Sequence, residues 1–241
     1  MLFYIVRMIV YDDNAYYAYL SIEQQRAALL RSHTTVQQTD YGTGALQDGS
    51  PFAKLRRVAD IARTHLESPK VAQMLFRLVN YLTATQQRAL HIVELGTSLG
   101  VTTAYMAAPS RRNTVQTYEG AEEVLDIAEQ VWRTIGLTNI EPVLGNIDDT
   151  LPQHCPESVD MAYIDANHTF EATMRYFRQL LPAMDEQGIM VVDDIYHSPD
   201  MERAWRAIQG NPAVTSTVDC YHVGLVFFNQ HYIRKHYKIR I

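Results

Sequence analysis

The chain has little cysteine and no long apolar run. Its 241 residues include only two cysteines, Cys155 and Cys220, which lie far apart in the sequence. This excludes a disulfide framework and a cysteine-ligated zinc site, and it favours a reducing, cytoplasmic compartment. Arg7 interrupts the apolar segment at residues 1–11, well short of the ~20 apolar residues that a membrane-spanning helix needs. The segment also lacks the pattern of a signal peptide.

The chain also lacks an excess of positive charge. Its 21 lysines and arginines stand against 27 aspartates and glutamates, which gives a formal net charge of -6. This balance argues against a general nucleic-acid or anionic-membrane partner. The basic cluster between His231 and Arg240 is more typical of a solvated surface than of a binding patch. The length allows one large domain with a small N-terminal extension.

The first fifty residues show no sustained hydrophobic period. They are polar and rich in tyrosine from about Asp12 onward, so we predict a largely irregular arm over residues 1–50 that could fold over a site. Two amphipathic helices are predicted next, one starting at Ser50-Pro51 and one over residues 69–85. We assign residues 51–241, including these two helices, to a single domain.

From residue 91 the sequence alternates between short apolar runs and helical patterns. The helical patterns cover residues 102–108, 121–135 and 169–181. Such alternation predicts a parallel sheet that helices cover on both faces. The predicted strands are His91–Leu95, Thr114–Tyr118, Ile140–Leu144, Val159–Ile164 and Gly188–Val192.

The C-terminal part ends in two strands that must be antiparallel. A helix that starts at Ser198-Pro199 leads to apolar runs at Ala213–Val218 and Val223–Phe228, which only a short polar link separates. A parallel crossover would need a dozen or more residues. The predicted fold is therefore an α/β fold with a doubly wound, seven-stranded, mostly parallel sheet whose final strand is antiparallel.

A glycine-containing turn follows the first strand of this sheet. Gly96 and Gly100 flank Thr97, Ser98 and Leu99, and glycines let the backbone approach a ligand that a Cβ would exclude. The next helix begins near Gly100, so its amide groups and the positive end of its dipole face the same crevice. In open α/β sheets, ligands bind in this crevice.

An acidic residue completes a site for an adenosine cofactor. Glu119 ends the next strand about 20 residues after Gly100, where a carboxylate can bind the two hydroxyls of a ribose. Pyrophosphate sites use a close G-x-G pair, which is absent here, and Glu94 would repel a pyrophosphate. An NAD-dependent oxidoreductase is therefore disfavoured but remains an alternative, as does a non-catalytic adenosine-cofactor-binding module.

These segments resemble the motifs of class I S-adenosylmethionine-dependent methyltransferases. The segment 94–100 resembles their first motif, Glu119 their ribose-binding acid, and the segment 145–152 the loop that flanks the adenine. Segments 76–81, 165–168 and 224–228 also resemble an uncharacterised bacterial subgroup of this class. The resemblance implies that S-adenosylmethionine is the cofactor and that its binding residues are Glu94, Gly96, Thr97, Ser98, Gly100, Thr102, Glu119, Asn146, Ile147, Asp148 and Asp165.

Acidic residues also end two later strands at the same edge of the sheet. Asp165 follows one strand, and Asp193 and Asp194 follow the next. Carboxylates ~4 Å apart repel by roughly 4 kcal/mol per pair at an effective dielectric near 20, so a proton, a basic side chain or a hard divalent cation such as Mg²⁺ must neutralise them. Adjacent strand residues point to opposite faces, so Asp194 could instead cap a helix or face solvent.

The three aspartates resemble the metal ligands of catechol O-methyltransferase-like enzymes, which implies a metal site at Asp165, Asp193 and Asp194. Asp194 departs from the asparagine that is frequent there. His168 occupies the position of the catalytic lysine in that family. A histidine can take a hydroxyl proton near neutral pH, so His168, with Asp165, is the catalytic candidate; alternatively it caps the helix that begins near Thr169. We therefore predict methyl transfer to a small-molecule acceptor, most readily at oxygen, by a chain that could form a homodimer.

Overall fold

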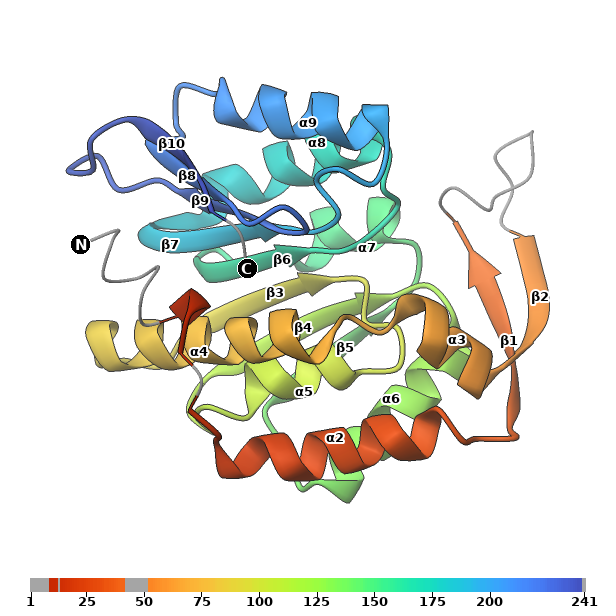
Figure 1. The fold of residues 1–241 in the computed structure, drawn as a ribbon. Helices are drawn as coiled ribbons and strands as arrows, with labels where there is room; N and C mark the ends of the chain where they lie inside the picture. Colours follow the sequence, from red (N-terminus) through yellow and green to blue (C-terminus); the bar gives the residue numbers. More distant parts are fainter. Residues whose placement is uncertain (1–8, 13, 42–51, 240–241) are drawn as a thin grey trace.

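The computed structural model describes residues 9–12, 14–41 and 52–239, and its centre is an eight-stranded sheet (Figure 1). The strand order is β10-β8-β9-β7-β6-β3-β4-β5. Only β9 is antiparallel to its neighbours, β7 and β8, so the predicted doubly wound, mostly parallel sheet is confirmed. The strands are β3 (His91–Leu95), β4 (Thr114–Glu119), β5 (Ile140–Leu144), β6 (Val159–Ile164), β7 (Met184–Val192), β8 (Ser216–Asp219), β9 (Gly224–Phe227) and β10 (Lys235–Lys238).

Helices cover both faces of this sheet, and neighbouring strand residues alternate between them. Ile92 packs in one core cluster with α4 (Pro69–Gln86), whereas Val93 packs in another with α8 (Phe170–Leu180) and α9 (Pro199–Gln209). In Figure 1, α8 and α9 lie on one side of the sheet and α4 and α5 (Val101–Ala107) on the other. The two remaining helices of the sheet domain are α6 (Glu122–Thr134) and α7 (Ile147–His154), the latter in a segment that we predicted to be a loop.

Two predicted helix starts are confirmed at atomic detail. The Ser68 side chain accepts a hydrogen bond from the Val71 amide at the start of α4, and Ser198 accepts one from Met201 at the start of α9. A proline follows each serine at the first helical position, where its missing N–H costs nothing.

The described part of the N-terminal arm is not irregular as predicted. It contains α2 (Tyr17–Leu29) and an antiparallel hairpin of β1 (Thr35–Asp40) and β2 (Phe52–Arg57), which leads into α3 (Val58–His65). The predicted helix start at Ser50-Pro51 lies outside the described residues; residues 52–57 form β2, and the helix begins at residue 58. Tyr19, Ile22 and Leu29 of α2 and Val36 of β1 are buried in a core cluster with α5 and α6. In Figure 1 the hairpin stands beyond the carboxyl ends of the parallel strands.

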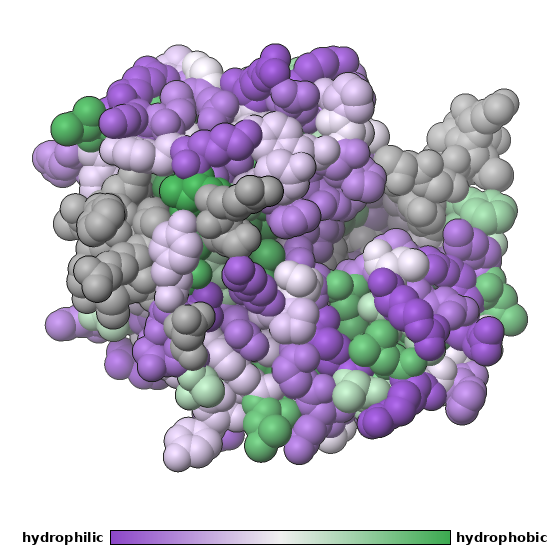
Figure 2. All heavy atoms as spheres, in the orientation of Figure 1, coloured by the Kyte–Doolittle hydropathy of each residue, from purple (hydrophilic) through white to green (hydrophobic). Residues whose placement is uncertain are grey.

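The prediction of seven strands is also wrong by one strand. The basic segment near the C-terminus forms β10, which pairs in parallel with β8 at the edge of the sheet. Its Lys238 Nζ lies 3.0 Å from the Tyr196 hydroxyl. The molecular face in Figure 2 is mostly hydrophilic. Among the residues that the structure describes, none of the helices combines the length and apolar character needed to cross a membrane.

Candidate active site

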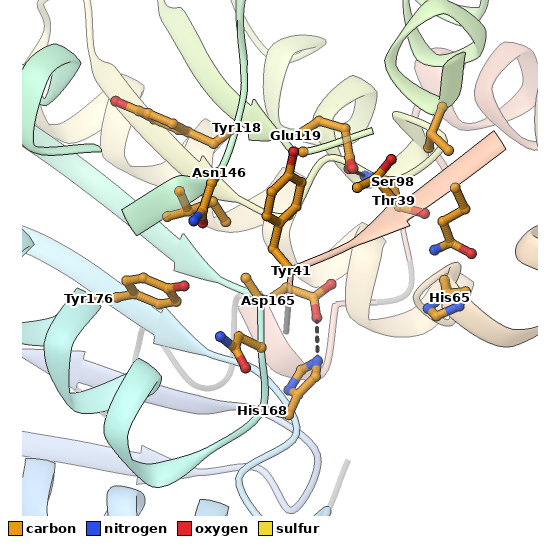
Figure 3. A pocket seen from close by; sticks show the side chains of 17 residues that line it. Thr39, Tyr41, His65, Ser98, Tyr118, Glu119, Asn146, Asp165, His168 and Tyr176 are labelled. Atoms are coloured by element: carbon orange, nitrogen blue, oxygen red, sulfur yellow. Dashed lines mark hydrogen bonds and ion pairs between the residues drawn. The ribbon is translucent and has the colours of Figure 1, made fainter. Parts of the chain in front are cut away.

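A cavity opens at the carboxyl edge of the sheet, where many of the predicted site residues gather (Figure 3). The loops after β3, β4, β5 and β6 form most of its wall, and the N-terminal hairpin, α3, α6 and α8 form the rest. The predicted residues in the wall are Gly96, Ser98, Glu119, Asn146, Ile147, Asp165 and His168. The other lining residues are Gln38, Thr39, Tyr41, His65, Tyr118, Gly120, Val124, Ala166, Asn167 and Tyr176.

The loop after β3 lies directly against the end of β6. Gly96 has a φ of +101°, and a Cβ on it would overlap the carbonyl oxygen of Asp165. Only glycine allows both this left-handed backbone and this close approach. The amides of Gly96 and Thr97 both donate to the carbonyl of Tyr118. The loop is thus held as a fixed cradle, with Gly96 and Ser98 in the cavity wall.

Gly100 positions the loop without lining the cavity. Its φ is +74°, and a Cβ on it would lie 2.5 Å from Nε1 of Trp132, which donates a 2.7 Å hydrogen bond to the Gly100 carbonyl. Thr102 follows in the first turn of α5 and is buried. Both predicted cofactor residues therefore lie behind the cavity wall.

Glu94 is buried completely and does not line the cavity either. Its Oε2 accepts hydrogen bonds from the hydroxyls of Thr103 (2.5 Å) and Thr117 (2.6 Å). The Thr97 hydroxyl lies 2.6 Å from that of Thr117, so Thr97 belongs to the same buried network. Burial raises the pKa of Glu94 to about 8, although the two hydroxyls oppose this shift. Glu94 therefore supports the loop after β3 through this buried hydrogen-bond network and not from within the cavity.

Glu119 ends β4 with its carboxylate in the cavity wall. Its Oε2 accepts a 2.8 Å hydrogen bond from the Ser98 amide, and its Oε1 accepts a 3.0 Å bond from the Ala121 amide. These bonds tie the loop after β3 to the loop after β4 and fix the orientation of the carboxylate. Each carboxylate oxygen can accept a further hydrogen bond, which suits the predicted binding of ribose hydroxyls.

The segment after β5 contributes Asn146 and Ile147 to the cavity. The Asn146 side chain caps α7 by accepting from the Asp148 amide. Asp148 itself makes a two-pronged ion pair with Arg175 of α8, at 2.9 and 2.7 Å. Such pairs are geometrically specific, and Asp148 does not line the cavity, so its predicted contact with a cofactor is not supported by this geometry.

His168 and Asp165 face each other at the lower end of the view in Figure 3. The His168 Nε2 lies 3.3 Å from Asp165 Oδ1. Burial lowers the pKa of His168, but the hydrogen bond and charge of Asp165 outweigh it and raise the pKa above its ordinary value. Helix α8 is capped by the Thr169 side chain, which accepts from the Ala172 amide. The alternative interpretation of His168 as the cap of this helix is therefore wrong.

Tyr163 lies between the two predicted metal ligands that end β6 and β7. Its hydroxyl donates a 2.9 Å hydrogen bond to Asp193 Oδ2 and lies 3.4 Å from Asp165 Oδ2. Asp193 is 5% exposed, and its Oδ1 has no hydrogen-bond partner in the part of the chain that the structure describes. Burial, followed by the charge of Asp165, raises the pKa of Asp193 well above its ordinary value. The raised pKa of Asp193 favours its protonated form, which lessens the repulsion predicted between the carboxylates.

The predicted three-aspartate metal site is not assembled. Asp194 has a φ of +52°, and its side chain lies 3.7 Å from Nδ1 of His197 instead of joining Asp165 and Asp193. Within residues 9–12, 14–41 and 52–239, no three His, Cys, Asp or Glu side chains are grouped to hold a metal ion. Asp193 and Asp194 follow the end of β7, and the backbone is left-handed at Asp194.

Part of the cavity wall comes from residues that we did not predict from the sequence. Gln38, Thr39 and Tyr41 come from β1 and its end, and His65 from α3. Arg56 of β2 holds this wall by contacting His65 Nε2 at 2.8 Å and donating to Gln38 Oε1 at 2.9 Å. No motif marks these residues, because the hairpin reaches the site only through the tertiary fold.

Three comparisons agree with this arrangement. A family model described as "Methyltransferase domain" matches residues 93–195. O-methyltransferase hkm8 of Aspergillus hancockii is 33% identical over 182 residues, which cover 70% of this chain and 69% of the relative. The O-methyltransferase of Bacillus cereus in complex with SAH has a similar structure (TM-score 0.62, 20% identity, 92% and 94% of the two chains). So does the O-methyltransferase TomG of Streptomyces achromogenes in complex with SAM (TM-score 0.61, 17% identity, 94% of each chain).

Proposed function

The chain belongs to the class I S-adenosylmethionine-dependent methyltransferases, and from this premise we propose that it methylates an oxygen atom of a small-molecule acceptor. One observation carries the proposal. A carboxylate suited to a ribose, Glu119, and a histidine paired with a carboxylate, His168, line the same cavity. The comparisons favour this function over the NAD-dependent oxidoreductase and the non-catalytic module.

The cavity fits the cofactor of this family. Gly96, which has no side chain to occupy the cavity, and Ser98 line it beside Glu119, whose carboxylate suits the hydroxyls of a ribose. We infer that Gly96, Ser98, Glu119, Asn146 and Ile147 hold the cofactor. When bound, S-adenosylmethionine supplies the electrophilic methyl group. The carboxylates of Glu119 and Asp165 also suit a ligand that carries an ammonium and a sulfonium charge.

His168 is the proposed general base. In its neutral form the ring can donate its Nε2–H to Asp165, which leaves the Nδ1 lone pair to accept the proton of an acceptor hydroxyl. Asp165 then stabilises the resulting imidazolium. A positioned base contributes about 10²- to 10⁴-fold to a rate, and holding both reactants in line supplies much of the remainder.

A divalent cation has no step in this proposal, because the donor set at Asp165, Asp193 and Asp194 does not fit a shared site. The choice of oxygen over nitrogen or carbon is supported by the names of the three relatives described above, each of which is an O-methyltransferase. A small-molecule acceptor is proposed on the same grounds. A homodimer and a cytoplasmic location stay predictions.

Calorimetric titration tests the cofactor, and product analysis tests the reaction. We expect the protein to bind S-adenosylhomocysteine and to convert S-adenosylmethionine into it in the presence of small phenols or alcohols, with the acceptor gaining one methyl group at oxygen. Binding of NADH in preference to S-adenosylhomocysteine would contradict the proposal. A methylated product that resists O-demethylation but carries an N-methyl group would overturn the choice of oxygen.

A further inference from the structure

Tyr41 lies in the cavity wall beside the glycine that follows the ribose-binding candidate. A Cβ on Gly120 would lie 2.6 Å from Cδ2 and 2.8 Å from Cε2 of the Tyr41 ring. Non-bonded carbon atoms prefer separations of about 3.5–4.0 Å, so the ring occupies the space where another residue would place its side chain. In Figure 3 the Tyr41 ring is seen between Glu119 and Asp165.

The position of Tyr41 is set by a strand that is anchored to the domain. Val36 of β1 is buried in the same core cluster as Val124 and Leu125 of α6. The amide of Gln37 donates a 2.6 Å hydrogen bond to Glu123 Oε2, at the start of α6. Because β1 is fixed to α6, the chain that follows it is directed toward the loop after β4, where Tyr41 covers Gly120.

Space, and not backbone conformation, explains the glycine at this position. Gly120 is absent from the residues with positive φ, which include Gly96 and Gly100. Gly120 therefore does not need glycine for a left-handed backbone, and the atoms that an added Cβ would meet belong to the Tyr41 ring. This makes the contact testable by a pair of small substitutions.

We propose that Tyr41 forms the outer wall of the nucleoside half of the cofactor site and packs its ring against the adenosine that Glu119 holds. The inference rests on the proposed function, and it assigns a role to a residue of the N-terminal hairpin. Tyr41 is 39% exposed, so it has free aromatic surface to offer a ligand. Stacking of an aromatic side chain on a nucleobase is sequence-tolerant and strong.

The first experiment compares two ligands by calorimetry. Tyr41→Ala should weaken the binding of S-adenosylhomocysteine and of adenosine by the same factor, about 5- to 150-fold. Tyr41→Phe, which keeps the ring, should bind both within about twofold of the original protein. Tyr17→Ala is the matched control, because Tyr17 is a fully exposed tyrosine on α2 and does not line the cavity.

The second experiment tests the contact between Tyr41 and Gly120 by adding a methyl group at Gly120. Gly120→Ala should displace the ring and weaken S-adenosylhomocysteine binding in the original protein, but it should cause no further loss in the Tyr41→Ala background. Thermal unfolding of each variant shows that it is folded. If Gly120→Ala does not fold, the comparison of the two ligands still decides the matter.

The outcomes separate this inference from the proposed function. If the original protein does not bind S-adenosylhomocysteine, the proposed function fails. If it binds but Tyr41→Ala binds equally well, the role of Tyr41 fails and the proposed function stands. If Tyr41→Ala weakens S-adenosylhomocysteine but not adenosine, the ring contacts the amino-acid half of the cofactor, and the inference is overturned.

Discussion

The backbone of Gly96 lies so close to that of Asp165 that a Cβ on Gly96 would overlap the Asp165 carbonyl oxygen. This contact joins the ends of β3 and β6, the two strands that carry the proposed cofactor loop and the proposed catalytic pair. The distance between the proposed methyl donor site and the proposed base thus depends on a residue without a side chain.

Gly96→Ala should therefore separate these two loops. We expect a loss of S-adenosylhomocysteine binding beyond detection by calorimetry and a drop in the free energy of unfolding of roughly 2–4 kcal/mol, from the positive φ and the clash together. Gly136→Ala is the matched control, because Gly136 has a φ of +73° but an added Cβ there would meet no atom within 4 Å. It should lose only about 1–2 kcal/mol and bind normally. Equal effects of the two changes would contradict this explanation.

Glu119→Ala should weaken S-adenosylhomocysteine binding about 10- to 150-fold, because hydrogen bonds to a charged acceptor are worth roughly 1.5–3 kcal/mol. The change also removes the acceptor of the Ser98 amide, so the cradle loses a support. Calorimetric titration measures the loss. Glu129→Ala, which alters a partly exposed residue of α6 that pairs with Arg133, should bind like the original protein. An unchanged dissociation constant for Glu119→Ala would refute the ribose assignment.

His168→Ala should slow methyl transfer by about 10²- to 10⁴-fold and leave the dissociation constant of S-adenosylhomocysteine unchanged. The rate of S-adenosylhomocysteine formation under saturating S-adenosylmethionine measures the first effect, and calorimetry measures the second. A variant as active as the original protein would show that His168 is not the base.

Asp165→Asn and Asp194→Asn form a matched pair for the acidic residues. Asp165 contacts His168, whereas Asp194 contacts His197, so only Asp165→Asn should slow methyl transfer strongly. Both rates are measured with and without a chelator. Equal losses in the two variants, together with inactivation by the chelator, would show that the carboxylates act jointly on a metal ion.

Stability should fall as the pH rises, because burial raises the pKa of Glu94 to about 8. The ordinary pKa of a glutamate is 4.5, so the unfolded chain releases this proton at a lower pH than the folded protein. The contribution of the Glu94 proton to the free energy of unfolding is complete below about pH 4.5 and is lost as the pH approaches 8. The decline amounts to roughly 5 kcal/mol at most. Urea unfolding at about pH 5, 6.5 and 8 measures the free energy of unfolding, which should decline less steeply with pH in Glu94→Gln than in the original protein. The same slope against pH in both proteins would contradict this explanation.

The sheet could be predicted because its central strands are buried on both faces. All six residues of β6 are buried and five of them are apolar, a pattern that is typical of a parallel strand. The starts of α4 and α9 were predictable because a serine and a proline act locally. These signals need no knowledge of distant residues.

The hairpin and β10 could not be predicted, since their conformations depend on what they pack against. β2 is almost entirely exposed, so its sequence has no apolar alternation, and the amphipathic pattern after Ser50-Pro51 suggested a helix over residues that form a strand. For the same reason the cavity residues that the hairpin supplies carry no motif. The direction of Asp194 was beyond the sequence as well, because it depends on the left-handed turn at that residue.

The hydrogen bond from Trp132 to the Gly100 carbonyl gives the protein an intrinsic optical reporter. The chain has only two tryptophans, and the other, Trp205, is packed against Gly224 on the opposite side of the sheet. An indole that donates to the cofactor loop senses any shift of that carbonyl through its excited-state dipole. Ligand-induced changes in tryptophan emission therefore report on this loop. They should persist in Trp205→Phe and vanish in Trp132→Phe.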